Sequence, residues 1–177
     1  MALKSESASS EMIKIGEVAR QLGISIRTIH MYEREGLFIA YKNSAGTRYF
    51  TTRDVDWLLE IRRMIKAGIS IAGIRRLLSL IPCWESKKCQ HQGKESCPVI
   101  TDSFNSCWAN KENLCHESAQ ECRRCEVYEM RFCVSMLKHV LDIRFKNEKG
   151  GEIRSWPEFM KDVHNGRGDL PSLRPQL

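Results

Sequence analysis

The sequence predicts a mainly α-helical protein, in which an N-terminal winged helix-turn-helix is followed by a small cysteine-rich module and a C-terminal helix. Three observations lead to this prediction. Two short helical patterns joined by a glycine-containing turn precede a hairpin pattern, all 8 cysteines fall between Cys83 and Cys133, and a heptad-like apolar pattern begins at Val127.

The first two helices are predicted over residues 15–22 and 26–35. Gly23 suits the left-handed conformation that commonly follows the last turn of a helix. Ser25 is a good N-cap, because its hydroxyl can accept a hydrogen bond from a backbone N–H of the second helix. Helix, glycine-containing turn and second helix is the plan that places a recognition helix in the DNA major groove.

A basic hairpin follows the second helix. The runs 38–41 and 47–50 are β-prone, and the Asn, Ser and Gly residues within 42–46 favour a turn between them. Lys42 and Arg48 stand on the two arms. A basic hairpin beside a recognition helix is a wing suited to contact with phosphates or the minor groove.

Two more helices complete this part. Thr51 and Asp54 have the spacing of a capping box, which predicts a helix from there to about residue 66. Ser70 is placed to cap another helix over residues 71–80. The predicted core residues are Leu22, Ile24, Ile29, Leu37, Val55 and Leu58.

Residues 12–80 resemble the winged-helix domain of MerR-family transcription regulators. The motifs that carry the resemblance are Ile15-Gly16-Glu17-Val18-Ala19, Thr28-Ile29, Tyr32-Glu33, Gly36-Leu37, Arg48-Tyr49-Phe50 and 74–78. The resemblance implies a homodimer on pseudo-palindromic, double-stranded promoter DNA, with RNA polymerase as a candidate partner there. It leaves open activation by distortion of an over-long promoter spacer and repression, as in a heat-shock-type subgroup.

The candidate DNA-contacting residues lie on the second helix and the hairpin. They are Ser25, Arg27, Thr28, His30, Met31, Tyr32, Arg34, Lys42, Asn43, Arg48 and Tyr49. The family often has Arg-Tyr where this chain has His30-Met31, so the operator is expected to differ. For Tyr32 a place in the core is an equal alternative, and for Thr28 a role in stabilising the first turn.

Charge and length agree with this interpretation. Residues 1–80 hold 13 Lys and Arg against 8 Asp and Glu, so most of the net charge of +6 lies there, where phosphate neutralisation would use it. No run of eighteen apolar residues occurs, so no membrane span is predicted. Residues 1–11 are polar and are expected to be a disordered lead rather than a signal peptide, which predicts a cytoplasmic protein.

The cysteines form a repeated pattern. Cys-Trp followed by two spaced cysteines occurs twice, and a Cys-x2-Cys pair ends the second copy, as in the small two-CW module of bacterial signalling proteins, which residues 81–125 resemble. The candidate ligands are Cys83, Cys89, Cys97, Cys107, Cys115, Cys122 and Cys125, whereas Cys133 lies outside the pattern. A cytosolic chain keeps thiols reduced, which favours metal or redox chemistry over disulfides.

The bound group is left open by the pattern. Four cysteines could hold an iron–sulfur cluster or a zinc ion, and metal-free thiol redox chemistry and a purely structural role are further alternatives. His91 and His116 could complete a site, or be exposed polar residues. Trp84 and Trp108 are expected to shield the site by packing. The segment is poor in large aliphatic residues, so a bound metal could supply cross-links that its core lacks.

The second half is predicted to contain a helix over residues 126–147. Apolar residues recur at helical spacing at Val127, Met130, Val134, Leu137 and Leu141. This seam could pair with a second subunit or close the cysteine module. Residues 148–177 are expected to be a partly flexible tail.

The sequence thus predicts a sequence-specific DNA-binding transcription regulator whose cysteine module senses redox or metal state through an iron–sulfur cluster or thiolate-bound metal. One alternative is a DNA-binding regulator with a purely structural zinc site. Another is an iron–sulfur or thiol enzyme that carries a DNA-binding domain. Against the enzyme, no His, Asp or Glu constellation surrounds a cysteine and no glycine-rich phosphate loop occurs.

Overall fold

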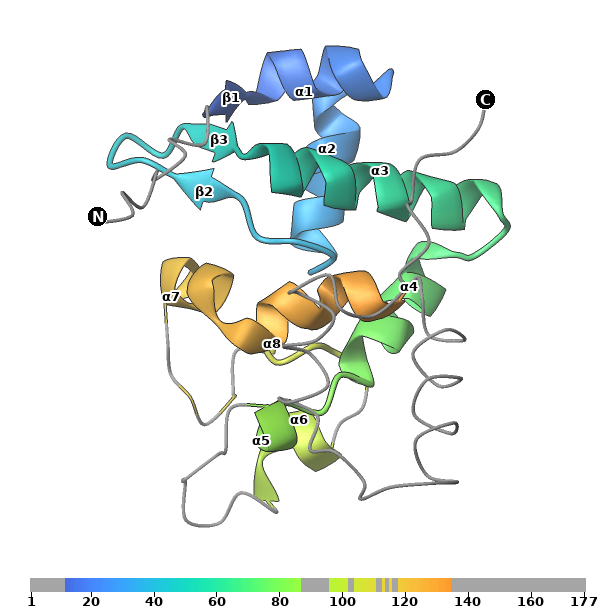
Figure 1. The fold of residues 1–177 in the computed structure, drawn as a ribbon, viewed down its shortest axis with the longest axis vertical. Helices are drawn as coiled ribbons and strands as arrows, with labels where there is room; N and C mark the ends of the chain where they lie inside the picture. The colour runs from blue at the N-terminus through green and yellow to red at the C-terminus, as the bar shows by residue number, and fades with distance from the viewer. Residues whose placement is uncertain are drawn as a thin grey trace, which may run out of the picture.

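Short helices and one small antiparallel sheet make up the described part of the computed structural model (Figure 1). The structure describes residues 12–86, 96–101, 104–110, 113, 115 and 118–134. Within them the predicted mainly α class with a winged helix-turn-helix is confirmed. The expected lead and tail, Cys89, His91, His116 and the predicted helix beyond residue 134 lie outside the described residues.

The helix-turn-helix forms where local signals predict it. Helix α1 spans Ile15–Leu22 and α2 spans Ile26–Arg34. Gly23 follows α1 with φ of 59°, in the left-handed region. The Ser25 Oγ accepts the Thr28 N–H at 3.0 Å, so the predicted N-cap is present.

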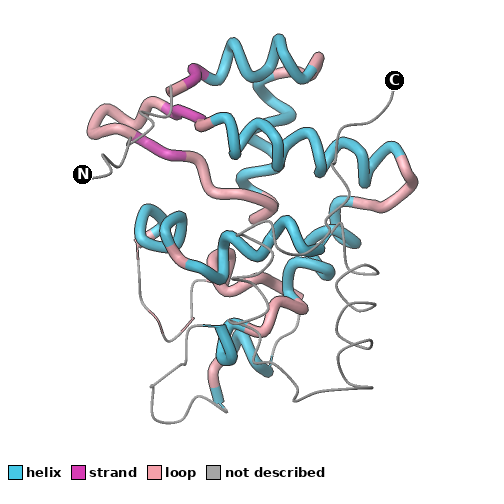
Figure 2. The backbone as a smooth tube through the Cα atoms, in the orientation of Figure 1, coloured by secondary structure: helices cyan, strands magenta, loops and turns pink. Residues whose placement is uncertain are grey.

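The wing is a three-stranded antiparallel sheet in the order β1-β3-β2, built from β1 (Ile13–Lys14), β2 (Tyr41–Lys42) and β3 (Arg48–Phe50). The first arm was expected to start at residue 38, but β2 starts only at Tyr41. The residues before it run as a buried loop between the upper helices and α7–α8 (Figure 2). They make no strand ladder because their backbone groups bond to side chains from later in the chain.

Two further helices follow the sheet in the chain. Helix α3 spans Thr52–Lys66 and α4 spans Ile71–Ser79. Both predicted caps are present: Thr51 and Asp54 form a reciprocal capping box, and the Ser70 Oγ accepts the Gly73 N–H. The fully buried Trp57, which the sequence interpretation did not single out, donates its Nε1–H to the Leu37 carbonyl at 2.8 Å.

One hydrophobic core runs through both halves of the described chain. Five of the six predicted core residues are buried in it, whereas Ile24 is half-buried and packs against it. Residues from the second half join the same cluster, namely Val127, Met130 and Cys133. The cysteine module packs against this core through Cys83, Cys107, Trp108 and Cys125, which suits a segment with few aliphatic residues.

The residues of the second half that the structure describes form very short helices. They are α5 (Cys83–Ser86), α6 (Pro98–Thr101), α7 (Ala119–Arg124), α8 (Glu126–Glu129) and the 3₁₀ helix Met130–Val134. The predicted α-helix from residue 126 therefore gives way to a 3₁₀ helix after one turn. The first two seam residues are buried in this chain's own core, so they are not available to a second subunit. No helix in the described ranges is long and apolar enough to cross a membrane.

Replacement of Gly36 by Ala is expected to destabilise the fold by about 2–4 kcal/mol. Gly36 has φ of +72°, and an added Cβ would lie 2.6 Å from the Ala109 Cβ of the cysteine module. Gly16→Ala is the matched control, because nothing lies within 4 Å of its added Cβ and Ala is favoured inside a helix. Urea unfolding measures both, and equal midpoints for the two variants would contradict the close packing at Gly36.

Candidate nucleic-acid interface and cysteine pocket

The exposed face of α2 is basic. Arg27, His30 and Arg34 are exposed on it, and the N-cap Ser25 is exposed beside them. Thr28 is half-buried, and its hydroxyl shares a 2.9 Å hydrogen bond with the Ser25 hydroxyl, so it helps to form the first turn. Arg27, His30 and Arg34 are therefore the titratable side chains of α2 that are accessible to a ligand.

Two candidates on α2 face inward instead. Tyr32 is 5% exposed and belongs to the core, which supports the packing alternative for its ring. Burial raises the pKa of Tyr32, against the opposing effect of the nearby Arg62. Met31 is half-buried and packs against the core. The burial of Tyr32 follows from helical periodicity, since Tyr32 lies three residues after Ile29 on the inner side of α2.

The wing is tied to α2 by a carboxylate. The Glu33 side chain accepts Lys42 Nζ at 2.9 Å and Arg48 Nε at 2.6 Å. Burial alone would raise the pKa of Glu33, but the hydrogen bonds from Lys42 and Arg48 outweigh it and lower the pKa below its usual value. One carboxylate thus offsets part of the wing charge while it fixes the wing against the recognition helix.

The remaining wing candidates have structural contacts. The Asn43 Oδ1 accepts the Thr47 N–H at 2.8 Å, which closes the turn, and Tyr49 is half-buried in β3. Sequence reasoning did not identify Glu33 as the residue that positions the wing. A sequence signal for this role of Glu33 was that it is an acidic residue on an otherwise basic second helix.

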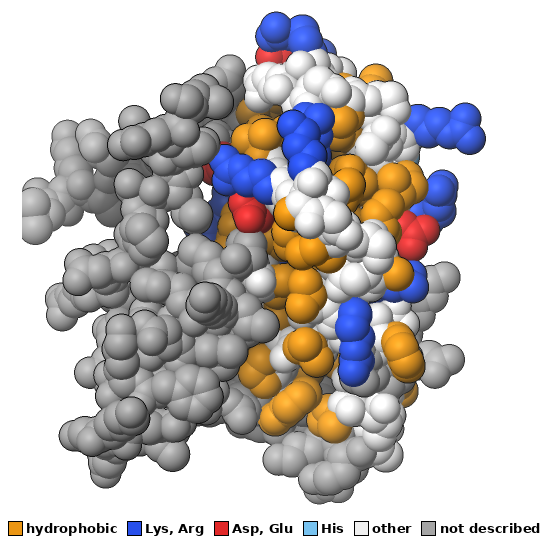
Figure 3. Space-filling model, turned by 90° about the vertical axis from the view of Figure 1, so that its right-hand side faces the viewer, with side chains coloured by type: hydrophobic (Ala, Val, Ile, Leu, Met, Phe, Trp, Pro, Cys, Tyr) orange, Lys and Arg blue, Asp and Glu red, His pale blue; other side chains and the backbone are white. Residues whose placement is uncertain are grey.

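On one face of the molecule, the basic side chains do not gather in one place. Figure 3 shows Lys and Arg spread over the face in view, among hydrophobic side chains and few acidic ones. A candidate nucleic-acid interface therefore rests on α2 and the wing and not on a general basic surface.

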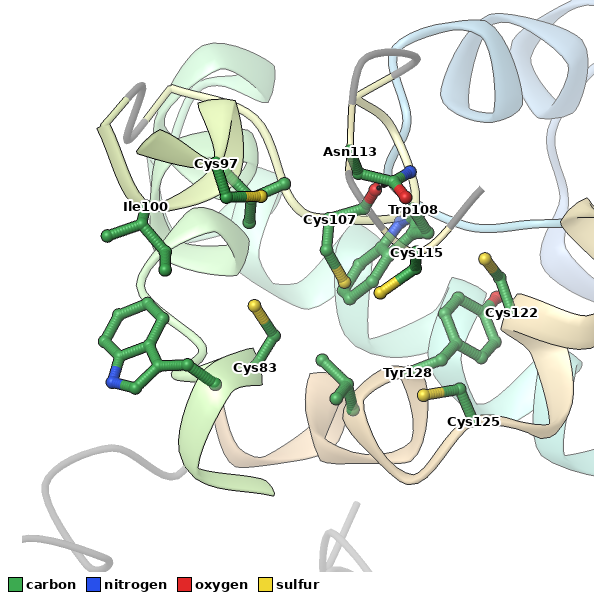
Figure 4. Close-up of a pocket in the computed structure, with 13 residues that line it drawn as sticks. Cys83, Cys97, Ile100, Cys107, Trp108, Asn113, Cys115, Cys122, Cys125 and Tyr128 are labelled. Carbon is green, nitrogen blue, oxygen red and sulfur yellow. Dashed lines mark hydrogen bonds between the residues drawn. The ribbon is translucent and has the colours of Figure 1, made fainter. Parts of the chain in front are cut away.

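Six of the seven candidate cysteine ligands line a single pocket. They are Cys83, Cys97, Cys107, Cys115, Cys122 and Cys125. Figure 4 shows Cys83, Cys107 and Cys115 with their sulfur atoms turned towards the pocket. The pocket has about 630 Å³ of empty space, part of it open to solvent, and Trp84, Trp108 and Tyr128 contribute to its wall.

The thiols of this pocket interact with one another. Cys107 hydrogen-bonds to Cys83, so the first cysteines of the two Cys-Trp repeats meet. That hydrogen bond, burial and the neighbouring thiols raise the pKa of Cys107 well above its usual value. Deprotonation of Cys107 without a compensating cation is therefore unfavourable.

The eighth cysteine lies elsewhere. Cys133 is buried in the shared core and is not among the pocket residues, as its place outside the repeat suggested. Among the residues that the structure describes, no three Cys, His, Asp or Glu side chains lie close enough to form a metal-binding group. The cysteines thus surround a common space without converging on one point.

Side chains of the cysteine module bond to the backbone of the loop between α2 and β2. We call Trp108, Gln120, Arg123 and Tyr128 the clamp residues. Trp108 donates to the Gly36 carbonyl at 2.9 Å, the Ile39 N–H donates to the Tyr128 hydroxyl at 2.8 Å, and Arg123 donates to the Ile39 carbonyl. Gln120 donates to the Ala40 carbonyl at 3.4 Å.

Arg123 also forms a buried ion pair with Asp54. Its two Nη atoms lie 3.1 and 2.8 Å from the two carboxylate oxygens, and the side chains are 13% and 4% exposed. Burial alone would lower the pKa of Arg123, but its hydrogen bond and attraction to Asp54 raise it overall. Sequence reasoning missed this pair, because 69 residues separate its members.

Known proteins resemble the N-terminal part of this chain. The model of the MerR HTH family regulatory proteins matches residues 13–81. The HTH-type transcriptional regulator GlnR of Bacillus anthracis is 33% identical over 76 residues, which are 43% of this chain and 59% of GlnR. The regulator TnrA of Bacillus subtilis is 34% identical over 64 residues, 36% of this chain and 58% of TnrA.

The likeness is therefore partial: the chain spans less than two thirds of the length of these relatives. Among solved structures, HiNmlR, a MerR family regulator lacking the sensor domain and bound to promoter DNA, is 20% identical with a TM-score of 0.38. The match covers 81% of this chain and 98% of HiNmlR, and at that score it supports no further argument.

Buried thiols are expected to react slowly with iodoacetamide in the folded chain. Burial raises the pKa of Cys133 to about 11, so only about one molecule in a thousand carries its thiolate near pH 8. The rate at Cys133 should rise about tenfold per pH unit, and stability from the neutral thiol should be lost as pH rises above 9 towards 11. Peptide mass spectrometry with chelator present measures the rate, and a native rate equal to that in urea would contradict the burial.

Proposed function

We propose that this chain, whose residues 13–81 form a MerR-family helix-turn-helix domain, is a sequence-specific DNA-binding transcription regulator controlled through its cysteine pocket. The exposed basic face of α2 is the observation that carries the DNA-binding part. GlnR and TnrA, both named as transcriptional regulators, are similar to the same segment.

In this proposal α2 enters the major groove of promoter DNA. Arg27, His30 and Arg34 contact bases or phosphates. Lys42 and Arg48 bring the wing close to the DNA backbone. A homodimer would place two copies of α2 on two half-sites, and RNA polymerase would be the partner affected at the promoter. Because His30 and Met31 cannot make the bidentate guanine contact of an arginine, the operator differs from those of relatives with Arg-Tyr.

The pocket is proposed to hold a thiophilic centre, an iron–sulfur cluster or a thiolate-bound metal such as zinc. Six cysteines around one largely apolar space fit soft cations, which prefer thiolate sulfur. When bound, the group supplies cross-links between the short helices and a redox or metal-dependent state. The residues of this chain provide the thiolates, exclude water with Trp108 and Tyr128, and release thiol protons on binding.

Two other functions are weighed against this one. In the first alternative, a zinc ion in the pocket only stabilises the module, which its scarcity of aliphatic residues favours. The second is an iron–sulfur or thiol enzyme with a DNA-binding domain. The enzyme has little support from the sequence, because no His, Asp or Glu constellation surrounds a cysteine there.

Arg27→Ala is expected to weaken binding about tenfold on a duplex that wild type selects from a random pool. The reason is that each good arginine contact to a base or phosphate contributes about 1–3 kcal/mol. Arg63→Ala is the control, because Arg63 is exposed on α3 and pairs with Glu60 there. Fluorescence anisotropy over a range of salt measures both, and equal affinities for Arg27→Ala and wild type would contradict the assigned DNA face.

Anaerobically purified protein is expected to contain zinc, or iron with matching sulfide, and the double variant Cys122→Ser/Cys125→Ser should lose most of it. Thiolates ligate these groups and serine does so poorly. Cys133→Ser is the matched control, because Cys133 is outside the pocket. A visible spectrum with elemental and sulfide analysis distinguishes an iron–sulfur cluster from zinc. A wild-type protein without metal would contradict the proposed thiophilic centre.

A further inference from the structure

The cysteine pocket and the loop between α2 and β2 are built from the same side chains. Trp108 and Tyr128 line the pocket, and both hydrogen-bond to the backbone of residues 36–40. The two rings also contact each other edge to face, with centroids 5.1 Å apart. Figure 4 shows Tyr128 beside Cys122 and Cys125. No intervening layer separates the thiols from the loop.

Every clamp residue is close in sequence to a pocket cysteine. Trp108 follows Cys107, and Arg123 lies between Cys122 and Cys125. Trp108 lies in a turn, and the helices that carry the other three clamp residues are short, with 6 residues in α7 and 4 in α8. Each clamp side chain is therefore within three residues of a pocket cysteine, so a backbone shift at the cysteine would reach it directly.

The clamped loop joins the two DNA-facing elements. It begins directly after α2 and its cap Glu35, and it leads into β2 of the wing. Leu37, Phe38, Ile39 and Ala40 are all buried, so their backbone groups need protein partners. The Leu37 N–H bonds back to the Tyr32 carbonyl near the end of α2. A movement of this loop therefore changes the angle between α2 and the wing.

The Arg123–Asp54 pair extends the connection to α3. The Asp54 carboxylate accepts the Thr51 N–H at 2.9 Å in the capping box and also receives Arg123. Arg123 thus contacts the start of α3 and the Ile39 carbonyl at the same time. The neighbouring Arg124 is exposed, which makes it a natural control for charge without the clamp geometry.

We infer that the clamp residues are positioning residues that transmit the state of the cysteine pocket to α2 and the wing within a single subunit. The inference rests on the proposed function, because it describes the regulation of the same pocket. When the pocket cysteines take up a thiophilic ion, each ligating thiol releases its proton to solvent and the sulfur atoms move towards one centre. Trp108, Arg123 and Tyr128 follow, and the loop over residues 36–40 takes up the displacement.

The test is hydrogen–deuterium exchange of the full chain, reduced and metal-free or loaded with zinc ion alone. In wild type, zinc is expected to slow amide exchange over residues 37–40 at least about threefold, because ordering the module lowers local opening. Tyr128→Phe keeps the ring but removes the acceptor of the Ile39 N–H, and should remove most of this response. Tyr41→Phe, on an exposed ring of β2, should respond as wild type does.

A second pair of variants tests the ion pair. Arg123→Lys keeps the charge but loses the forked geometry, so the zinc response should fall, whereas Arg124→Lys should leave it unchanged. If the clamp is purely structural, amide exchange in the variants should be faster by the same factor with and without zinc. The ratio of the exchange rates with and without zinc would then stay as in wild type. That result, in folded variants by circular dichroism, would overturn the inference.

The metal content of the same samples separates this inference from the proposed function. Stoichiometric zinc with unchanged exchange over residues 37–40 in wild type overturns the coupling and leaves the thiophilic centre standing. For a metal-free wild type, the comparison uses Cys122→Ser/Cys125→Ser, which alters the pocket directly. If exchange over residues 37–40 is faster in that variant, and this increase is smaller when Tyr128→Phe is added, the coupling is supported although the proposed thiophilic centre is contradicted. If exchange does not change, both the coupling and the thiophilic centre are overturned.

Discussion

The buried backbone of residues 36–40 must be hydrogen-bonded, and the rest of the described structure depends on how that is achieved. A buried peptide group without a partner costs about 1–3 kcal/mol. This loop has no neighbouring strand, so Trp57 from α3 and the clamp residues from the cysteine module supply the donors and acceptors. The recognition helix, the wing and the cysteine pocket are thereby held in one packed body.

Two carboxylates organise the charged groups around that loop. Glu33 joins the wing cations to α2, and Asp54 caps α3 while it receives Arg123. Buried ion pairs contribute less to stability than to the choice of one geometry, since desolvation offsets much of their attraction. Of the two, only the Arg123–Asp54 pair is buried, whereas the Lys42 and Arg48 partners of Glu33 are partly exposed. Removal of one partner of the buried Arg123–Asp54 pair is expected to destabilise the fold as well, because it leaves the other charge unpaired.

The thin core of the cysteine module explains why it shares one with the winged helix. Short helices with few aliphatic residues cannot bury enough apolar surface alone. Val127 and Met130 therefore enter the winged-helix core, and Phe132 packs edge to face on Trp57 with centroids 5.4 Å apart. Because the core is shared, single side chains connect the cysteine pocket with the loop over residues 36–40, which leads into the wing.

The sequence by itself determined what depends on neighbours along the chain. Helices α1 to α4, the left-handed Gly23 and the Thr51–Asp54 capping box follow from spacing and capping chemistry within a few residues. The Cys-Trp repeat likewise separated the six described pocket cysteines from Cys133 before their positions were known.

Only the tertiary structure decided the contacts that join distant segments. The loop in place of a strand at residues 38–40 and the 3₁₀ helix after α8 accompany the packing of the two halves against each other. The clamp bonds span 72 to 89 residues. No local pattern encodes such pairs, because each partner is chosen by the backbone groups that the fold has already buried.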